Sequence, residues 1–176
     1  MSLPTLEAIH NGELVRLRDI ELDEVAALRR MFALPGLREW WGAQDPDDDS
    51  EILNDGCAFA IEIDGVLAGW LGFDEELDPQ YKFASLDIML APGYHGRGLG
   101  PAALRLAIGW LIDERGHRRF TIDPAADNAR AIAAYVDIGF RPVGLLREYE
   151  LTPDGTYRDG LLMDLLASEI RPPSGL

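Results

Sequence analysis

The sequence predicts an α/β protein, in the broad α+β sense, with one mixed sheet and helices packed on it. Three observations support this prediction. Segments with strand-like apolar patterns recur along the chain, segments of helical spacing lie between them, and a glycine-rich turn joins one strand to the longest helix. The 176 residues suit one domain with one substantial core. We expect this domain at residues 1–170, followed by a flexible tail at residues 171–176.

The first quarter of the chain contains one strand pattern and then helical patterns. Residues 14–18 alternate between apolar and polar side chains, which predicts a strand. Residues 22–33 have apolar side chains at helical spacing, and the stop signal Pro35-Gly36 follows them. Short helices are expected at residues 37–41 and, from its acidic beginning, at residues 47–54.

The middle of the chain predicts a hairpin, a further strand and the longest helix. Residues 58–63 and 66–73 read as strands, and the Asp64-Gly65 pair between them is a strong hairpin signal. Residues 85–90 form the next apolar strand pattern. Residues 101–115 then carry apolar side chains along one helical face.

The last third predicts a strand, a helix and a final hairpin. Residues 119–122 read as a short strand. Asn128 is a good N-cap for a helix at residues 129–138, since its side chain can accept a hydrogen bond from a backbone N–H in the first turn. Residues 140–150 and 157–166 form two strand patterns around a turn rich in Pro, Asp and Gly.

The charge balance is strongly acidic. The chain has 16 Lys and Arg against 31 Asp and Glu, a formal net charge of −15. This charge argues against nucleic acid or an anionic membrane surface as a partner. It is compatible with a cationic substrate, whose approach a negative cleft favours, and equally with a solubility role. The acids gather at residues 45–51 and 74–79 near aromatic residues, as a solvated surface or as the rim of a binding site.

Several classes of protein are disfavoured by what the sequence lacks. No apolar run approaches the ~20 residues that span a bilayer, and the first ten residues do not resemble a secretory signal. Cys57 is the single cysteine, so no internal disulfide is expected, and we expect a cytoplasmic location. His10, His95 and His117 lack metal-ligand spacing, so no metal site is expected.

The most informative motif is YHGRGLGP at residues 94–101, between a predicted strand and the long helix. Its glycines allow close approach of the backbone to an anion, and the first N–H groups of the helix would point at that anion. The Walker pattern fails because the loop contains no lysine. The dinucleotide pattern fails because Pro101 stands at its third glycine. The loop alone fits either a phosphate-binding turn or a connection without a ligand.

A second motif, IDPAADNARAIAAYVDIGF at residues 122–140, favours the phosphate-binding interpretation of the loop. With the loop, it resembles the GCN5-related N-acetyltransferase (GNAT) superfamily, in which a Q/R-x-x-G-x-G/A loop binds the pyrophosphate of acetyl-CoA. An N-x-x-A-x-x-x-Y-x-x-x-G-F segment follows it. The matching residues are Asn128, Ala131, Tyr135, Gly139 and Phe140, while His95 departs from the Gln/Arg position.

The resemblance implies the GNAT fold, a mostly antiparallel twisted sheet splayed between the fourth and fifth predicted strands. It also implies acetyl-CoA as co-substrate, no metal, and a monomer or homodimer. The implied cofactor-binding residues are Ile88, Met89, Leu90, His95, Gly96, Arg97, Gly98, Leu99, Gly100, Pro101, Asn128, Ala131 and Tyr135.

Four local matches look like the aminoglycoside 6'-N-acetyltransferases: residues 39–42, 74–79, 86–90 and 123–124. In that family, the aspartates that correspond to Asp87 and Asp123 face the amines of the drug. The tyrosine that corresponds to Tyr135 lies near the thioester sulfur. The implied catalytic residues are Asp87, Tyr135 and Asp123, and the implied substrate-binding residues are Trp40, Trp41, Asp74, Glu75, Glu76, Asp87 and Asp123.

These residue types suit acetyl transfer from a thioester to an amine. A lysine-like amine has a pKa of about 10.4, so it arrives as an ammonium and must lose a proton. Asp87 is the first candidate to receive that proton, although Asp87 and Asp123 could serve only to bind the cation. Tyr135 is a hydroxyl donor or a core residue, and the pair Trp40-Trp41 lines the acceptor pocket or packs on the sheet.

The expected function is direct acetyl transfer to a primary amine of a polycationic small molecule, specifically the 6'-amine of an aminoglycoside. Siderophore-type lysine N-acyltransferases share the Trp pair and both motifs, but they usually carry a histidine before the loop, and residues 83–90 contain none. Another small molecule or a protein N-terminus remains a possible acceptor, and a non-catalytic acyl-CoA-binding module is a further alternative. A covalent acyl-enzyme is not expected, because Cys57 has no His or Asn partner nearby in sequence.

Overall fold

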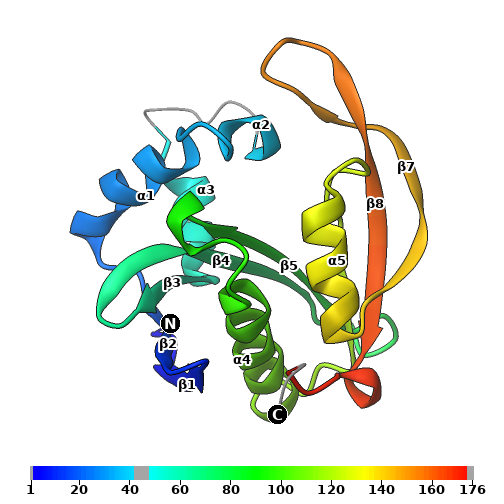
Figure 1. The fold of residues 1–176 in the computed structure, drawn as a ribbon. Helices are drawn as coiled ribbons and strands as arrows, with labels where there is room; N and C mark the ends of the chain where they lie inside the picture. Colours follow the sequence, from blue (N-terminus) through cyan, green and yellow to red (C-terminus); the bar gives the residue numbers. More distant parts are fainter. Residues whose placement is uncertain (1, 42–47, 174–176) are drawn as a thin grey trace.

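The computed structural model describes residues 2–41 and 48–173, which form one sheet with helices on both faces (Figure 1). The strands are β1 Leu6–His10, β2 Glu13–Asp19, β3 Ala58–Ile63, β4 Val66–Glu76, β5 Phe83–Leu90, β6 Arg119–Ile122, β7 Arg141–Leu151 and β8 Tyr157–Leu166. The α-helices are α1 Val25–Phe32, α2 Arg38–Trp41, α3 Ser50–Leu53, α4 Leu99–Asp113 and α5 Ala129–Ile138. Short 3-10 turns occupy Leu22–Glu24, Asn54–Gly56, Pro92–Tyr94 and Ala167–Glu169.

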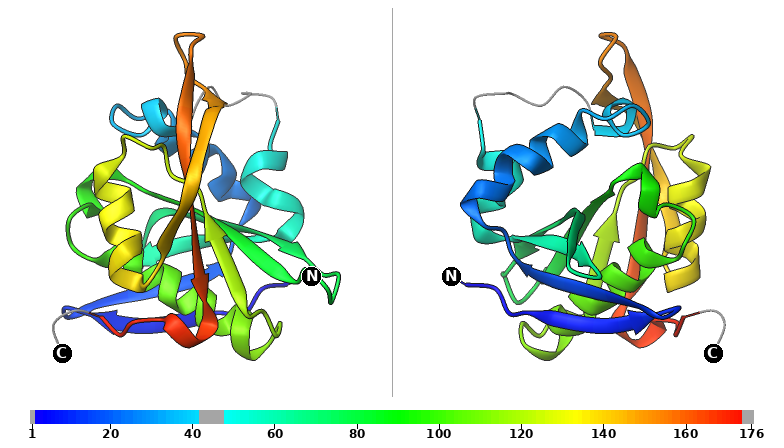
Figure 2. Two further views of the ribbon diagram at one scale, coloured as in Figure 1. Left: turned by 90° about the vertical axis from the view of Figure 1, so that its right-hand side faces the viewer. Right: turned by 60° about the vertical axis from the view of Figure 1, so that its left-hand side comes forward.

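The sheet has the order β1-β2-β3-β4-β5-β6-β8-β7, and each pair of neighbours is antiparallel except β5 and β6. The predicted mixed sheet with flanking helices is therefore confirmed. The β7–β8 hairpin extends beyond the other strands, as both views in Figure 2 show. Its tip lies at the same end of the molecule as α2 (Figure 1).

Two apolar clusters lie on opposite faces of the sheet. On one face, α4 and α5 bury side chains such as Leu104, Ile108 and Ile138 against the strands. On the other face, α1, α2 and α3 pack around Trp70 and Met89. The two clusters follow from strand geometry, because successive side chains of β4 and β5 point to opposite faces.

Most predicted elements lie where the patterns place them, with two informative differences. Strand β1 was not predicted, because its five residues LEAIH are half exposed and show a short pattern. Helix α4 begins at Leu99, two residues before the predicted start at Pro101. Gly98 has a φ of 76° and precedes the helix, so Pro101 lies in the first turn, where its missing N–H is not needed.

Strands β5 and β6 part after a very short parallel ladder. Only Ala84 with Phe120 and Ser85 with Thr121 are paired. Since β1 shifts the numbering by one, this is the splay predicted between the fourth and fifth strands. Beyond the paired residues, Asp87 on β5 and Asp123 after β6 lie on diverging chain segments.

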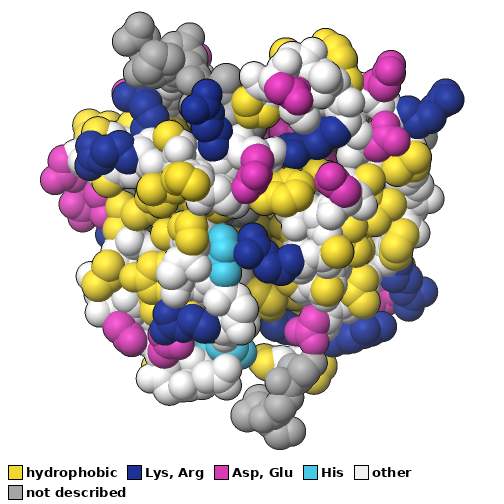
Figure 3. Space-filling view, turned by 45° about the horizontal axis from the view of Figure 1, so that its top comes forward, with side chains coloured by type: hydrophobic (Ala, Val, Ile, Leu, Met, Phe, Trp, Pro, Cys, Tyr) yellow, Lys and Arg dark blue, Asp and Glu magenta, His cyan; other side chains and the backbone are white. Residues whose placement is uncertain are grey.

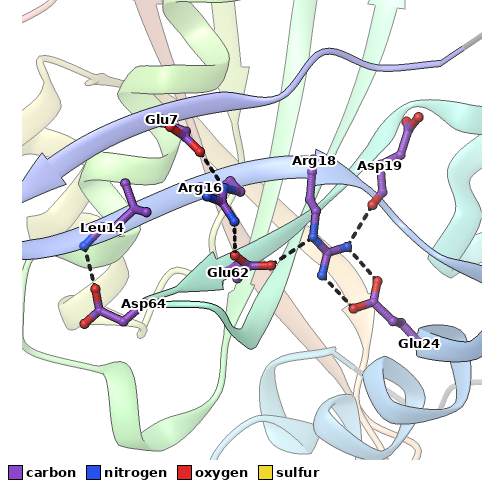
Figure 4. Close-up of polar contacts among 8 residues, drawn as sticks. All are labelled: Glu7, Leu14, Arg16, Arg18, Asp19, Glu24, Glu62 and Asp64. Atoms are coloured by element: carbon purple, nitrogen blue, oxygen red, sulfur yellow. Dashed lines mark hydrogen bonds and ion pairs between the residues drawn. The ribbon is translucent and has the colours of Figure 1, made fainter.

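An ionic network joins the N-terminal strands to the beginning of α1 (Figure 4). Glu62 on β3, with a side chain 9% exposed, accepts hydrogen bonds from Arg16 at 2.6 Å and Arg18 at 3.0 Å. Arg18 also binds Glu24 at 2.7 Å, and Arg16 binds Glu7 of β1 at 2.6 Å. The network therefore bridges β1, β2, β3 and the turn that leads into α1.

The start of the predicted tail is bound to the body of the protein. The backbone N–H of Arg171 donates to the carbonyl of Ile138 at 2.8 Å, and Arg105 donates to the carbonyl of Arg171 at 2.9 Å. Residues 174–176 of that tail lie outside the described residues. The helices within residues 2–41 and 48–173 include none with the length and hydropathy of a membrane span.

Replacing Glu62 with Gln should lower the free energy of unfolding by about 1–3 kcal/mol, because two charge-assisted hydrogen bonds in a protected position are weakened. Urea denaturation at pH 7 measures this loss. The control Glu7→Gln weakens the ion pair of Arg16 with a partner that is more exposed than Glu62. It should therefore cause a smaller loss of unfolding free energy. Equal losses in the two variants would contradict the central role of Glu62.

Candidate active site

A glycine-rich turn connects β5 to α4 and leaves unpaired backbone donors at the beginning of the helix. Gly96 and Gly98 have φ angles of 72° and 76°, which favour glycine. A Cβ at residue 98 would also lie 2.4 Å from Nε2 of His10. The first N–H groups of α4 have no acceptor within the helix, so they can bind an anion at the positive end of the helix dipole.

A cavity of about 440 Å³ lies between this turn, α4 and α5. Most of the predicted cofactor-binding residues line it. They are Ile88, Leu90, His95, Gly96, Gly98, Leu99, Gly100, Pro101, Ala131 and Tyr135. We call this space the coenzyme cavity. Its walls combine backbone donors with mostly apolar side chains, which suits a ligand that carries both phosphate groups and a long organic arm.

Three predicted cofactor-binding residues have side chains elsewhere. The side chain of Met89 is buried on the opposite face of the sheet, against Trp70, so only its backbone can face a ligand. The guanidinium of Arg97 binds Glu13 and lies 5.5 Å from the ring centroid of Tyr94, outside the coenzyme cavity. Asn128 caps α5, since its Oδ1 accepts a hydrogen bond from the third residue of that helix at 3.2 Å.

His95, at the position where the family motif has Gln or Arg, is turned toward the strand. Its Nε2 lies 2.7 Å from the carbonyl oxygen of Leu90, so this nitrogen carries the proton. Burial lowers the pKa of His95, and the hydrogen bond to Leu90 only partly opposes that effect. The side chain thus closes the turn as a neutral imidazole, and the backbone donors remain the anion-binding groups.

A second cavity, of about 160 Å³, adjoins the coenzyme cavity. The two share Ile88, Ala131 and Tyr135. Asp87, Asp123, Trp40 and Trp41 also line the second cavity, which we call the acceptor cavity. The structure therefore brings together the three predicted catalytic residues and the Trp pair.

Tyr135 lies at the junction of the two cavities and is 9% exposed. Burial raises its pKa, and the carboxylates of Asp87 and Asp123 raise it further. Its hydroxyl therefore keeps its proton at neutral pH. Among the described residues, the hydroxyl has no hydrogen-bond partner, so the proton is available to a ligand at this junction.

Asp87 and Asp123 face the acceptor cavity from the two diverging strands. Desolvation by the surrounding protein raises the pKa of Asp87 to about 7, and the charges of Asp123, Asp74 and Glu150 add to this shift. Burial also raises the pKa of Asp123, while a hydrogen bond from the hydroxyl of Tyr149 at 2.8 Å lowers it. Asp87 thus titrates near neutral pH.

Tyr149 is a site residue that the sequence analysis missed. A register shift of β7 between Leu146 and Glu150, with a φ of 48° at Glu148, places Tyr149 over Gly160 of β8. A Cβ at residue 160 would lie 2.8 Å from Cδ1 of Tyr149. A glycine within a predicted strand is a signal of such close approach. The hydrogen bond to Asp123 is the main reason that the pKa of Tyr149 rises to about 12.

Arg158 of β8 joins the hairpin to α2 beside the acceptor cavity. Its guanidinium binds the carboxylate of Glu150 at 2.8 Å and the backbone oxygen of Glu39. It also lies 5.3 Å from the ring centroid of Trp40. Figure 3 shows this end of the molecule, where hydrophobic side chains are spread over the face with acidic and basic side chains among them, and a His and a basic side chain lie at its middle. Arg158 thus fixes one wall of the acceptor cavity.

The three acids predicted on β4 have different surroundings. Asp74 points to the same face as Asp87 and lies near it. The prediction for Glu75 is corrected, because strand alternation turns it to the other face, where it binds Arg115 and lies 2.6 Å from Nε2 of His117. Glu76 accepts a hydrogen bond from the backbone of the following loop and lines neither the coenzyme nor the acceptor cavity.

Two further predictions can be placed only in part. Of the acidic run at residues 45–51, residues 45–47 lie outside the described residues. In the ranges 2–41 and 48–173, no group of three His, Cys, Asp or Glu side chains is arranged to hold a metal ion.

Comparison with known proteins identifies similar chains. Residues 18–140 match the model of the acetyltransferase (GNAT) family. Spermidine N(1)-acetyltransferase of Escherichia coli strain K12 is 29% identical over 159 residues, which cover 85% of this chain and 84% of that protein. The ribosomal protein bS18-alanine N-acetyltransferase of the same strain is 37% identical over 107 residues, 61% of this chain and 69% of that protein.

Two other comparisons concern length and fold. An uncharacterized Mycobacterium leprae protein is 29% identical over 135 residues, and the chain spans only 35% of its length. The structure of Mycobacterium smegmatis RimJ in complex with CoA-disulfide has a TM-score of 0.80 at 23% identity, and the match covers 98% of this chain and 90% of that one. The expected GNAT architecture is thereby confirmed.

Replacing Asp87 with Asn should raise the melting temperature, and the gain should be larger at pH 8 than at pH 5. The folded pKa is about 7, whereas an unfolded Asp has a pKa of about 3.9. Between these values the unfolded chain releases its proton first, so ionisation of Asp87 lowers stability as the pH rises. Asn removes this effect.

Thermal unfolding of both proteins at the two pH values measures the difference. The exposed Asp113, at the end of α4, provides a matched control, since Asp113→Asn should show no such growth of the gain with pH. A gain at pH 8 no larger than that at pH 5 would contradict the raised pKa of Asp87.

Proposed function

The chain belongs to the GNAT family of N-acetyltransferases, which use acetyl-CoA as co-substrate, and we propose that it acetylates a primary amine of a small polycation. One observation carries this proposal. The acceptor cavity holds the carboxylates of Asp87 and Asp123, and it meets the coenzyme cavity at Tyr135. A negative cavity beside a thioester site favours a cationic amine, and the net charge of −15 favours its approach.

The coenzyme cavity offers contacts for the pyrophosphate of acetyl-CoA and for the pantetheine arm that carries the thioester. In this proposal the backbone N–H groups from Gly96 to Gly100 bind the pyrophosphate, and the dipole of α4 adds to that attraction. The apolar side chains of Ile88, Leu90 and Ala131 lie along the path to Tyr135 and would contact the pantetheine arm. This arrangement directs the thioester to the junction with the acceptor cavity.

The reaction removes two protons from the ammonium nitrogen and adds one to the departing sulfur, and we assign the first removal to Asp87 and the addition to Tyr135. In the proposed mechanism, Asp87 accepts a proton from the ammonium, and the freed amine nitrogen attacks the thioester carbonyl. A base with a pKa near the working pH suits this role. When the carbon–sulfur bond breaks, Tyr135 donates its proton to the departing sulfur. The attacking nitrogen loses its second proton as the amide forms, and this proton passes through solvent to restore the hydroxyl of Tyr135. Asp87 releases the first proton to solvent, so the net reaction yields the amide, free coenzyme A and one proton. Asp123, oriented by Tyr149, binds the amine beside Asp87.

Two kinds of small polycation are candidates for the acceptor. The similarity to spermidine N(1)-acetyltransferase supports a polyamine. The matches at Trp40, Trp41, Asp87 and Asp123 support the 6'-amine of an aminoglycoside, because these residues line one cavity. A second candidate function, acetylation of an alanine N-terminus, is favoured by the similarity to the ribosomal protein bS18-alanine N-acetyltransferase.

A screen of acetyl-CoA consumption should separate these acceptors. We expect turnover with spermidine or a kanamycin-type aminoglycoside, and weaker turnover with a peptide that begins with alanine. Release of the free thiol of coenzyme A measures the rate, and mass spectrometry identifies the acetylated amine. Absence of turnover with every aminoglycoside would remove that candidate, and absence with every polycation would contradict the proposed function.

The pH dependence of kcat/KM should reveal the pKa of the catalytic base. With the best acceptor, kcat/KM should rise with pH through an apparent pKa near 7, since Asp87 must lose its proton before it can accept one. Asp87→Asn should lower kcat/KM roughly 100-fold and remove this step. The affinity for acetyl-CoA, measured by calorimetry, should stay unchanged.

Asp113→Asn serves as the control for the loss of one negative charge far from the site. A step near pH 7 that persists in Asp87→Asn would exclude Asp87 as the base. Loss of acetyl-CoA binding in that variant would place Asp87 in the coenzyme site instead.

A further inference from the structure

A third cavity, of about 310 Å³, lies under α1, α2 and α3 on the face of the sheet that carries Asp87. It shares Asp87 and Trp41 with the acceptor cavity, so the two cavities adjoin at these side chains. The proposed acetyl transfer needs only the coenzyme and acceptor cavities. The third cavity is therefore not required by that reaction.

Three aromatic rings form the apolar part of this cavity. Phe32 and Trp41 have ring centroids 4.9 Å apart, and each lies 5.7 Å from the centroid of Trp70, all in edge-to-face arrangements. The indole N–H of Trp70 donates to the carbonyl of Ile52 at 2.7 Å, which fixes the ring. Aromatic surfaces of this kind attract organic cations and keep water away from them.

The space beside Trp70 depends on a glycine. Gly72 is the cross-strand partner of Asp87, and a Cβ at residue 72 would lie 2.2 Å from Cη2 of Trp70. The indole therefore lies across the strand at the position that a side chain would occupy. This packing places the indole ring of Trp70 beside Asp87, on the neighbouring strand. The cavity therefore depends on a glycine at residue 72.

The polar part of the cavity consists of three carboxylates without cationic partners and of Asn54, whose amide donates to the carbonyls of Cys57 and Phe73. Asp74, Asp87 and Glu51 line it, and none of their side chains has a hydrogen bond or ion pair with another described residue. By contrast, Glu150 and Asp123 of the acceptor cavity are bonded to Arg158 and Tyr149. The charge of Asp74 adds to the raised pKa of Asp87, and a cation bound beside them would oppose that repulsion.

We propose that the third cavity binds a second ammonium group of the acceptor, between Asp74 and Glu51, while the reacting amine lies at Asp87 and Asp123. The proposal rests on the proposed N-acetyltransferase function and assigns the second positive charge of its polycationic acceptor to a subsite of its own. Trp41, common to both cavities, would contact the chain that links the two amines. Monoamines fill only the acceptor cavity and should be poor substrates.

A matched pair of acceptors tests this subsite. For the wild-type protein, kcat/KM should be at least tenfold higher with 1,4-diaminobutane than with butylamine, which has the same carbon chain and one charge fewer. Asp74→Asn and Glu51→Gln should each lower kcat/KM for the diamine about tenfold. Glu51→Gln should leave kcat/KM for butylamine within twofold, and Asp74→Asn, which also removes a charge that raises the pKa of Asp87, should lower the value for the diamine more than that for butylamine. Asp113→Asn, the charge-matched control, should change neither value. Glu51 is exposed on a short helix, so its variant also tests the subsite if Asp74→Asn fails to fold.

A binding measurement separates the subsite from the reaction. Calorimetry of spermidine with the protein saturated by coenzyme A should show binding that weakens about tenfold in Asp74→Asn. If no amine is turned over but this dependence is seen, the subsite is supported and the proposed function fails. If diamine and monoamine are acetylated equally well, or if Asp74→Asn affects both equally, the subsite is overturned and the acetyltransferase function stands.

Discussion

The parting of β5 and β6 after two paired residues is the constraint on which the whole site depends. A longer parallel ladder would close the sheet and leave no space between the strands for a ligand. Because the ladder ends at Ser85 and Thr121, the next residues of both chain segments face an opening. At the closed end, Glu75 of β4 binds Arg115 and lies 2.6 Å from Nε2 of His117, just before β6. This buried ionic cluster ties β4 to the segment that enters β6 and so marks where the strands stay together.

The opening brings carboxylates together without cations to pair them. Glu62, by contrast, is paired with Arg16 and Arg18 on the N-terminal strands. In the opening, Asp87 and Asp74 have no cationic partner among the described residues, and Asp123 has only a tyrosine hydroxyl. Functional sites commonly sacrifice stability in this way. The paired networks on the other strands stabilise a fold that carries such a cluster.

The sequence predicted what local patterns can encode. Helix α5 and its cap Asn128 came from short-range signals, and so did the glycine turn before α4. Tyr149 and Arg158 could not be found in this way, since each acts on a partner far along the chain. The error at Glu75 has a different cause. An acidic run looks uniform in sequence, but strand alternation sends its neighbours to opposite faces.

The charge of the acceptor also affects the base that receives its proton. Desolvation raises the pKa of Asp87 to about 7, and the carboxylates around it add to this shift, so an unoccupied site holds a partly protonated base at neutral pH. An ammonium beside Asp74 would oppose that effect and lower the pKa of Asp87, because a nearby positive charge favours the ionised form. More of the enzyme would then carry the carboxylate that the reaction needs, although each carboxylate would be a weaker base. A second positive charge on the substrate would therefore contribute twice, to binding and to the ionisation of Asp87. A neutral or singly charged amine of the same length would lack both effects.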